Sequence, residues 1–513
     1  MSKSRPINYC LILIFILSFV FRFYNFPNWT FFGMDQEYEA FIAKNIITGR
    51  HFPLIGVNAS DTGLYLGPFF IYFASIFFAF FKGNPIGWAA IGSTLGVIVC
   101  YLVYRVGKEI FSQKVGYFAS LIYAGSFLVA FYERQFWNPM LVPIFSLITG
   151  YLLYQILHKH TSKLIWLAVV FGLAIQTHLS MLIFTPLIFY VIWMRKKDIL
   201  KKNIILALLV FIILQSPLII FDIRHNFTNS RAALSLIKNF NKSTEVKSNF
   251  QQRKNLFLSS LGRFIWVPIG PDLFLESGQC KELATYRKNS YPEVIFLALV
   301  GIGIFIFNNA PKSRSKIIIG ILILTLAFAV LYNREIFEYY FLFFFPWLAI
   351  ILGNSLDLIS TRKRGSLITV ILLVVFIISN LLTLFTAKFS YSYKDKLNAL
   401  AFAKKYVREG NYDLEALGEC TRFGGYRYLF EYYVGKPAHS YMDSYFSWLY
   451  YEEDLQTDKE VSVILLSMID PRDNSENIAK WQEVRLQYLS EYKLQAENKF
   501  GNIGVLILSP IKK

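Results

Sequence analysis

The stretch Phe32 to Arg50, FGMDQEYEAFIAKNIITGR, around which the rest of the chain is arranged, sets several carboxylates directly after the first apolar segment. These carboxylates belong to Asp35, Glu37 and Glu39. An apolar run, Ile7 to Phe26, precedes the stretch, and an apolar and aromatic run, Leu64 to Phe81, follows it. We therefore expect the acidic residues at a membrane surface rather than in a soluble core, and we look for the chemistry of the protein there.

The composition is that of a polytopic membrane protein. Of the 513 residues, 55% are hydrophobic and 18% aromatic, and the mean hydropathy is +0.42, which soluble globular domains rarely reach. The net charge of +18 does not indicate nucleic acid, because the basic residues cluster in short loops between apolar runs, as the positive-inside bias requires. The four cysteines form neither a CxxC pair nor a metal-ligand spacing.

An apolar helix of about 20 residues crosses the hydrocarbon core of a bilayer. The first apolar run lacks a small-residue cleavage site, so we interpret it as a retained span and not as a signal peptide. The runs interpreted as spans are Ile7 to Phe26, Ile86 to Val106, Val115 to Phe131, Met140 to Leu157, Leu164 to Thr177, Met181 to Met194, Ile204 to Phe221, Val294 to Phe307, Ile317 to Tyr332, Phe341 to Leu352 and Leu367 to Ala387. Leu64 to Phe81 is ambiguous.

The basic connectors decide the ambiguous run. If the N-terminus is cytoplasmic and Leu64 to Phe81 lies along the outer surface, every basic connector falls inside, whereas a crossing would move all of them outside, against the charge rule. The connectors are Arg105/Lys108/Lys114, Lys159/Lys163, Arg195/Lys196/Lys197/Lys201/Lys202, Lys312/Arg314/Lys316 and Arg362/Lys363/Arg364. We predict about eleven spans plus interfacial helices, with the C-terminus on the same outer side as Asp35.

This topology gathers the unusual polar residues of the membrane part on its outer face. Besides the first acidic stretch, they are Glu133/Arg134, His178, Asp222/Arg224/His225 and Arg334/Glu338/Tyr339. Arginine is least expected on the outer face, so these arginines favour an anionic ligand. The long outer segment that starts at Asp222 also holds LFLSSLGRFIWVPIGPDLF, which is typical of interfacial helices.

From Lys388 the composition changes, and we predict two domains, a transmembrane domain over residues 1–387 and a soluble α/β domain over residues 388–513. Tyr393 to Glu409 is typical of an amphipathic helix closed by Gly410, and Val461 to Leu466 and Ile503 to Leu508 are typical of buried strands.

Motifs for other chemistries are absent from the sequence. There is no Walker loop, no GxGxxG and no HExxH, so a nucleotide-sugar donor bound on a Rossmann-like domain is disfavoured. Spans with almost no charge in their middles weaken an ion-coupled transporter. No clear set of metal ligands is present, so the sequence allows a divalent metal without requiring one.

Each candidate residue also has an ordinary explanation. Asp35 can be a solvated interfacial acid, with Glu37 and Glu39 as bystanders. Glu133 and Arg134 can form an ion pair at the membrane boundary, beside an aromatic belt. His178 can be a turn residue between two short helices. Arg224, His225 and Arg334 can simply flank helices.

The membrane part, about the first two thirds of the chain, resembles the GT-C fold glycosyltransferases that use polyprenyl-phosphate sugars. Among these it is similar to the bacterial family 39 type, near the protein O-mannosyltransferases and the lipid A aminoarabinose transferases. The resemblance lies in the order of FGMDQEYEAF, LYLGPFFIYFASIFF, YRVGKEIFSQK, YERQFWNPMLVP, GLAIQTHLS, FDIRHNFTNSRAAL and REIFEYYFLFFFPWL. The family's usual His-Pro-Pro-Leu is replaced here by LYLGPF.

By this resemblance Asp35 matches the first-loop acid that serves as general base, and positive side chains near EYYF match those that hold the donor phosphate. Where the family has an acid after the third span and then an aliphatic stretch, this chain has Glu133 followed by Arg134 and Trp137. The expected catalytic residues are Asp35, Glu37 and Glu133. The expected substrate-binding residues are Arg134, His178, Arg224, His225, Arg334, Glu338 and Tyr339.

The sequence therefore predicts a glycosyltransferase of the cell membrane. It moves a sugar from a polyprenyl-phosphate carrier to an extracytoplasmic lipid, glycan or protein acceptor, with inversion. A carboxylate to deprotonate the acceptor and guanidinium groups for the departing phosphate suit this chemistry. One alternative is a flippase for lipid-linked sugars without transferase activity. Another is a sensor whose C-terminal domain binds a ligand near Tyr426 or Trp448.

Overall fold

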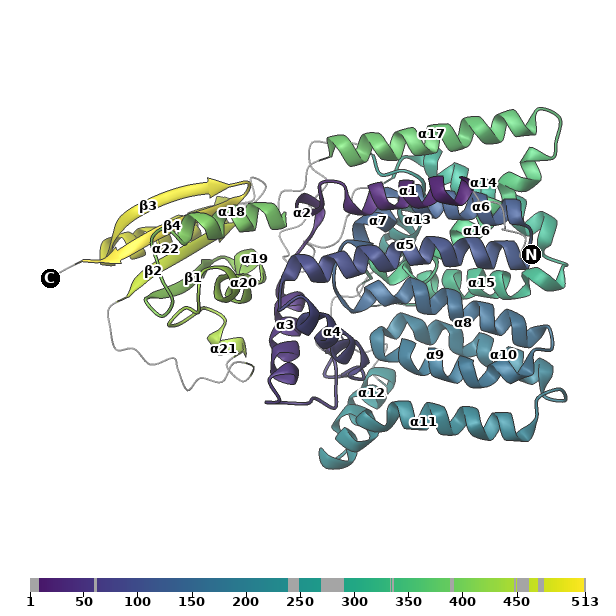
Figure 1. Ribbon diagram of the computed structural model, residues 1–513, viewed down its shortest axis with the longest axis horizontal. Coiled ribbons are helices and arrows are strands. Elements are labelled where there is room, and N and C mark those ends of the chain that lie inside the picture. The colour runs from purple at the N-terminus through teal and green to yellow at the C-terminus, as the bar shows by residue number, and fades with distance from the viewer. Residues whose placement is uncertain are drawn as a thin grey trace, which may run out of the picture.

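The computed structural model describes residues 9–59, 62–238, 249–268, 290–332, 334, 336–387, 392–446, 449, 461–468 and 475–511. A part built of helices lies next to a smaller part that contains a sheet (Figure 1). The helices of the first part are α1 (Tyr9–Phe23), α2 (Phe26–Trp29), α3 (Met34–Ile47), α4 (Phe69–Phe80), α5 (Pro85–Ile110), α6 (Gln113–Gly125), α7 (Phe127–Glu133), α8 (Val142–Leu157), α9 (Leu164–Thr177), α10 (Thr185–Arg195), α11 (Lys201–Arg224), α12 (Thr228–Lys238), α13 (Phe250–Ile265), α14 (Pro292–Asn309), α15 (Lys316–Leu331), α16 (Phe345–Ser360) and α17 (Gly365–Thr386). Short 3-10 segments include η1 (Asn138–Leu141), η3 (Leu179–Phe184) and η6 (Glu338–Phe341).

Within the described residues, 6 helices are long and apolar enough to cross a membrane, and the pair α6 and α7, bent by 66°, makes a seventh if it counts as one span. Five shorter apolar helices are Tyr9–Phe23, Phe69–Phe80, Thr161–Thr177, Leu179–Arg195 and Phe345–Ser360. Every run that the sequence predicts as a span overlaps with one of these helices or, for Val115 to Phe131, with the bent pair. The runs that fall on the shorter helices, or overlap with them only in part, are Ile7 to Phe26, Leu164 to Thr177, Met181 to Met194 and Phe341 to Leu352.

The ambiguous run forms a short helix. α4 has 12 residues, which gives a length of about 18 Å at 1.5 Å per residue, well short of a hydrocarbon core of about 30 Å. It lies beside α3 at the end of the helical part that faces the sheet (Figure 1). The prediction that Leu64 to Phe81 lies along the outer surface rests on the charge rule, because helices that match predicted spans, such as α9 and α10, are of similar length.

The basic connectors lie together at the opposite end. Lys114 Nζ is 3.4 Å from Asp357 Oδ1 and donates to Ser360 Oγ at 2.6 Å, which joins the α5–α6 connector to the end of α16. Arg314 lies over the ring of Phe111, 5.2 Å from its centroid. α1 also begins at this end, away from the sheet (Figure 1). The basic connectors and the acidic α3 thus lie at opposite ends of the helical part (Figure 1).

The C-terminal part is an α/β domain, as predicted. Its sheet has the order β1-β2-β4-β3, with β1 and β2 parallel and the other pairs antiparallel. The strands are β1 (Tyr412–Leu417), β2 (Ser462–Met468), β3 (Tyr492–Phe500) and β4 (Ile503–Pro510), and the helices are α18 (Tyr393–Ala403), α19 (Glu419–Arg422), α20 (Tyr426–Tyr433), α21 (Asp443–Phe446) and α22 (Ser475–Glu491). Alternate residues of β2 and β4 are buried on opposite faces, one of which packs against α22.

Two details of this domain differ from the prediction. The helix predicted over Tyr393 to Glu409 ends earlier, at Ala403. Gly410 does not close it but lies in the turn before β1, with φ of 72°, and its amide donates to the Lys436 carbonyl at 2.8 Å. The apolar pattern continued past the end of the helix because Val407, in the following loop, is also buried. Tyr426 is buried, and Trp448 lies outside the described residues.

Candidate functional site

α3 carries the acidic stretch and begins at Gly33, whose amide donates to Gln36 Oε1 at 2.8 Å. Asp35 lies in the first turn of α3 and is exposed. A carboxylate in the first turn is favoured by the unpaired amides and the dipole at a helix N-terminus. Glu37 and Glu39, on the same helix, are fully buried. The three acids therefore occupy different environments, and Asp35 is the one that solvent and a substrate can reach.

Glu37 faces the C-terminal domain. Its Oε2 accepts a hydrogen bond from the Tyr428 amide at 2.6 Å. Burial raises the pKa of Glu37 to about 7, and the Tyr428 amide, Arg427 and Lys396 partly offset this rise.

Glu39 lies one helical turn after Asp35, on the same side of α3. Within the described residues, neither oxygen of its carboxylate has a hydrogen-bond partner. Burial first, and the charge of Asp35 second, raise the pKa of Glu39 well above its ordinary range. Burial thus disfavours the charged form of Glu39, the acid one turn away from Asp35.

Glu133 pairs with Arg22 of α1 and not with the adjacent Arg134. Arg22 Nε donates to Glu133 Oε2 at 2.8 Å, and Nη2 lies 2.6 Å from the same oxygen. The Tyr123 hydroxyl donates to Glu133 Oε1 at 2.8 Å. Arg134 is also fully buried, and its guanidinium donates to the carbonyls of Phe21 and Arg22 and lies over the ring of Trp29. Glu133 and Arg134 thus both hold α1 against the C-terminal end of α7.

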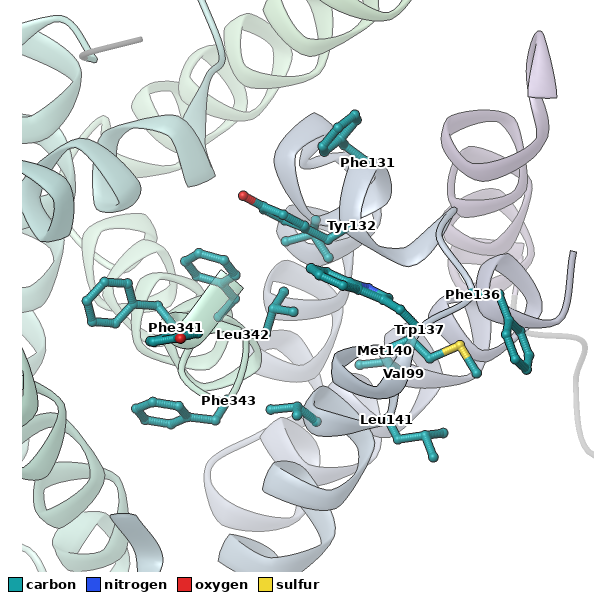
Figure 2. Packing of buried hydrophobic residues seen from close by; sticks show 14 of the residues in the cluster. Val99, Phe131, Tyr132, Phe136, Trp137, Met140, Leu141, Phe341, Leu342 and Phe343 are labelled. Carbon is teal, nitrogen blue, oxygen red and sulfur yellow. The ribbon is translucent and has the colours of Figure 1, made fainter. Parts of the chain in front are cut away.

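An aromatic cluster surrounds Tyr339. The ring of Trp137 lies 4.7 Å from it, and that of His178 lies 5.9 Å away. Tyr132 stacks on Trp137 with centroids 6.3 Å apart, and Figure 2 shows these two rings lying one above the other. His178 Nδ1 is 2.7 Å from Ser180 Oγ, and burial lowers the pKa of His178 to about 4, which keeps the imidazole neutral.

Glu338, next to this cluster, forms a buried ion pair with Arg263 of α13. Arg263 Nε donates to Glu338 Oε1 at 2.7 Å, Nη2 lies 2.5 Å from the same oxygen, and the Tyr132 hydroxyl donates to Oε2 at 3.1 Å. Arg263 is not among the site residues expected from the sequence. The signal was a lone arginine inside the apolar piece LFLSSLGRFIW, where a charge needs a buried partner.

Asp35 lies close enough to this cluster to act on it electrostatically. Burial, the neighbouring Tyr340 and the charge of Asp35, in that order, raise the pKa of Tyr339 well above its ordinary range. The structure thus brings together residues from α3, the end of α7, the α9–η3 turn and η6, as the predicted topology required.

The remaining candidates lie further out. Arg224 and His225 are exposed at the end of α11, and the His225 ring stacks on Phe221, 4.1 Å away, within the same helix. Arg334 is half-buried, just before η6. The first turn of α12 contacts the first outer loop through Asn229, whose side chain accepts from the Tyr65 amide at 2.7 Å and donates to the Tyr65 carbonyl at 3.0 Å. Within the described residues, no group of three or more His, Cys, Asp or Glu side chains could hold a metal ion.

Comparison with known proteins supports this fold. Residues 66–221 match the family model described as dolichyl-phosphate-mannose-protein mannosyltransferase. The structure of ArnT from Cupriavidus metallidurans bound to undecaprenyl phosphate aligns with a TM-score of 0.60 and 10% identity, over 97% of each chain. Archaeal oligosaccharyltransferase AglB from Archaeoglobus fulgidus, in complex with an inhibitory peptide and a dolichol-phosphate, aligns with a TM-score of 0.50 and 13% identity, over 97% of this chain and 74% of AglB. No curated protein sequence gives a significant match. The chain has the GT-C fold expected from the resemblance, and it is a membrane protein.

Proposed function

We propose that this protein is a membrane glycosyltransferase that moves a sugar from a polyprenyl-phosphate carrier to an acceptor hydroxyl or amine. The fold is shared with a protein solved with undecaprenyl phosphate and with an oligosaccharyltransferase solved with a dolichol-phosphate. The observation that carries the proposal is Asp35, an exposed carboxylate beside the aromatic cluster around Tyr339.

In the proposed reaction, Asp35 takes the proton of the acceptor as the acceptor atom bonds to the anomeric carbon of the sugar. The bond from that carbon to the phosphate oxygen breaks, and polyprenyl phosphate leaves. This direct displacement inverts the anomeric configuration. Tyr339 and His178, which are half-buried, offer aromatic and imidazole surfaces for the sugar, and the buried Trp137 packs against Tyr339.

We assign the other candidates by their surroundings. Arg334 holds the donor phosphate, and Arg224 and His225 attract anionic groups from the surface. Glu133 and Arg134 act through the packing of α1 on α7, and Glu338 through its pair with Arg263. A flippase without transferase activity has no need of Asp35 as a base, which separates it from this proposal.

We place the reaction on the extracytoplasmic side. The support is the segregation of the basic connectors to the end of the helical part opposite α3 (Figure 1), together with the excess of Lys and Arg in cytoplasmic loops.

The decisive experiment replaces Asp35 with asparagine. General-base catalysis contributes about 10²- to 10⁴-fold, so Asp35→Asn should lower the release of free carrier phosphate from a polyprenyl-phosphate sugar by that factor, with donor binding unchanged. Glu293→Gln is the matched control, because Glu293 is also an exposed acid in the first turn of a helix, α14. Turnover of Asp35→Asn within a few-fold of wild type, in folded protein, would show that Asp35 is not the base.

Arg334 tests the assignment of the donor phosphate. Arg334→Ala should weaken donor binding by about 1.5 to 3 kcal/mol, the scale of a charged hydrogen bond, and Arg334→Lys should restore only part of it, because the planar fork is lost. Titration with a fluorescent polyprenyl phosphate measures the effect. Arg231→Ala, at an exposed arginine of α12, is the control, and equal affinities for both alanine variants would assign Arg334 to another role.

A further inference from the structure

α3, the helix that carries Asp35, is held by the C-terminal domain at both of its ends. At its start, the Met34 amide donates to the Phe423 carbonyl at 3.0 Å. Near its end, Lys44 Nζ lies 2.5 Å from Glu431 Oε1, and Asn45 Nδ2 donates to the Leu449 carbonyl at 2.8 Å. The domain therefore supplies partners for a backbone amide of the first turn and for side chains of the last turn.

The two backbones approach closely at the start of α3. Gly425 has φ of 71°, and a Cβ there would lie 2.7 Å from the Gly33 carbonyl oxygen, so only glycine fits both the conformation and the space. Lys396 Nζ, which is buried, donates to the carbonyls of Phe32 and Gly424 and so joins the two segments. Removal of Lys396 would leave two carbonyls without that donor.

We call these contacts between α3 and the C-terminal domain the junction. Glu37 adds to the junction by taking the place of a capping side chain for α20, a helix of the C-terminal domain. α20 begins after Gly425, which has no side chain to cap it. The cap of a helix normally accepts from its second or third amide, and the third amide of α20, that of Tyr428, donates instead to Glu37 at 2.6 Å. The Tyr428 ring packs between Phe32 and Phe41. A carboxylate of α3 thus anchors α20, and α20 in turn fixes α3.

We propose that the C-terminal domain positions Asp35 for catalysis, with Glu37 and Lys396 as the positioning residues at the junction. The proposal rests on the proposed function, because it assigns Asp35 as the base. Asp35 follows Met34 directly and precedes Glu37 by half a turn, so it lies between two bonds to the domain. If the junction loosens, the contacts to the donor remain, but the Asp35 carboxylate can move away from the acceptor. Small displacements of a catalytic base lower the reaction rate strongly.

The test compares variants that remove the junction bonds while keeping side-chain volume. Glu37→Leu and Lys396→Met should each lower kcat about 10-fold or more, with the KM for the polyprenyl-phosphate sugar within about 3-fold of wild type. Glu37→Gln keeps an oxygen that accepts from the Tyr428 amide, so it should recover most of the activity. Arg485→Gln breaks an exposed ion pair with Glu497 inside the same domain and should have no effect.

Hydrogen exchange provides a readout that does not depend on activity. In Glu37→Leu and Lys396→Met, amides of α3 should exchange faster, while amides of α22 keep their wild-type protection. Wild-type kcat and wild-type α3 protection in both variants would overturn the proposal and leave glycosyl transfer standing. Loss of α22 protection together with that of α3 would also overturn it, because the residues would then serve folding of the whole domain. If wild-type protein transfers no sugar, the proposed function fails, and the exchange data alone decide whether the domain holds α3.

Discussion

At the scale of single residues, three acids within five positions of sequence have separate environments. Asp35 is exposed, while Glu37 and Glu39 are fully buried. Burial penalises the charged form of a carboxylate and raises the pKa of Glu37 and Glu39, whereas Asp35 is the acid that an acceptor can reach from solvent. Burial also favours the uncharged form of His178 in the aromatic cluster, so His178 offers a neutral ring rather than a charge.

The Glu37 carboxyl predicts a specific dependence of stability on pH. Its pKa rises from the ordinary value of 4.5 to about 7 in the folded protein, because of burial, against the lowering effect of the Tyr428 amide, Arg427 and Lys396, while Glu431 adds to the rise. Between pH 4.5 and 7 the unfolded chain has lost this proton and the folded chain keeps it, so stability falls as pH rises through this window. Glu37→Gln should remove that part of the fall.

Thermal midpoints of wild type and Glu37→Gln, measured in detergent at several values from pH 4.5 to 7, check this prediction. The wild-type curve should decline more steeply than that of the variant. The Lys396 ammonium makes a separate contribution. Burial lowers its pKa from 10.5 to about 7, so this contribution makes stability rise with pH above pH 7, outside the window used for Glu37. Parallel curves for the two proteins would show that Glu37 titrates alike in the folded and unfolded states.

At the scale of elements, buried ion pairs join helices that are far apart in sequence. Arg22 of α1 meets Glu133 at the end of α7, and Arg263 of α13 meets Glu338 of η6. α5 passes beside the first pair at Gly96, where a Cβ would lie 2.6 Å from Arg22 Nε and also against Glu133 Oε2. α1, α5 and α7 therefore meet at one buried ion pair, and this ion pair fits only because Gly96 has no side chain.

Gly96→Ala should consequently destabilise the protein by about 1 to 3 kcal/mol, since the added methyl group overpacks a buried site and displaces the ion pair. Gly303→Ala in α14 is the matched control, because nothing lies within 4 Å of a Cβ there and alanine favours the helix by about 0.5 to 1 kcal/mol. Thermal unfolding in detergent should show a lower midpoint for the first variant only. Equal midpoints would mean that the pair tolerates the methyl group.

At the scale of the whole molecule, the acidic helix and the basic connectors lie at opposite ends of the helical part, and the C-terminal domain contacts the acidic end (Figure 1). In the orientation proposed above, the carboxylates, the aromatic cluster and the C-terminal domain lie on the extracytoplasmic side. The basic connectors then lie on the cytoplasmic side, in agreement with the charge rule.

A reporter that is active only in the cytoplasm, fused after Lys513, should therefore be silent, while the same reporter inserted in the α5–α6 connector after Phe111 should be active. The pair of fusions controls for expression, because both use one chain. An active reporter after Lys513 would reverse the orientation and move the proposed reaction to the cytoplasmic side.

From the sequence alone one can predict the membrane class, the approximate positions of the apolar helices and two of the four strands, β2 and β4, because burial in lipid or in a sheet imposes a local period and length on apolar residues. The sequence also predicts that the connectors carrying the candidate residues lie on one face of the membrane part. Only the tertiary structure decided the partners: Glu133 with Arg22 rather than Arg134, Glu338 with Arg263, and Glu37 with the amide of Tyr428. These contacts join segments separated by 75 to 391 positions, and no local pattern encodes which distant group satisfies a buried charge.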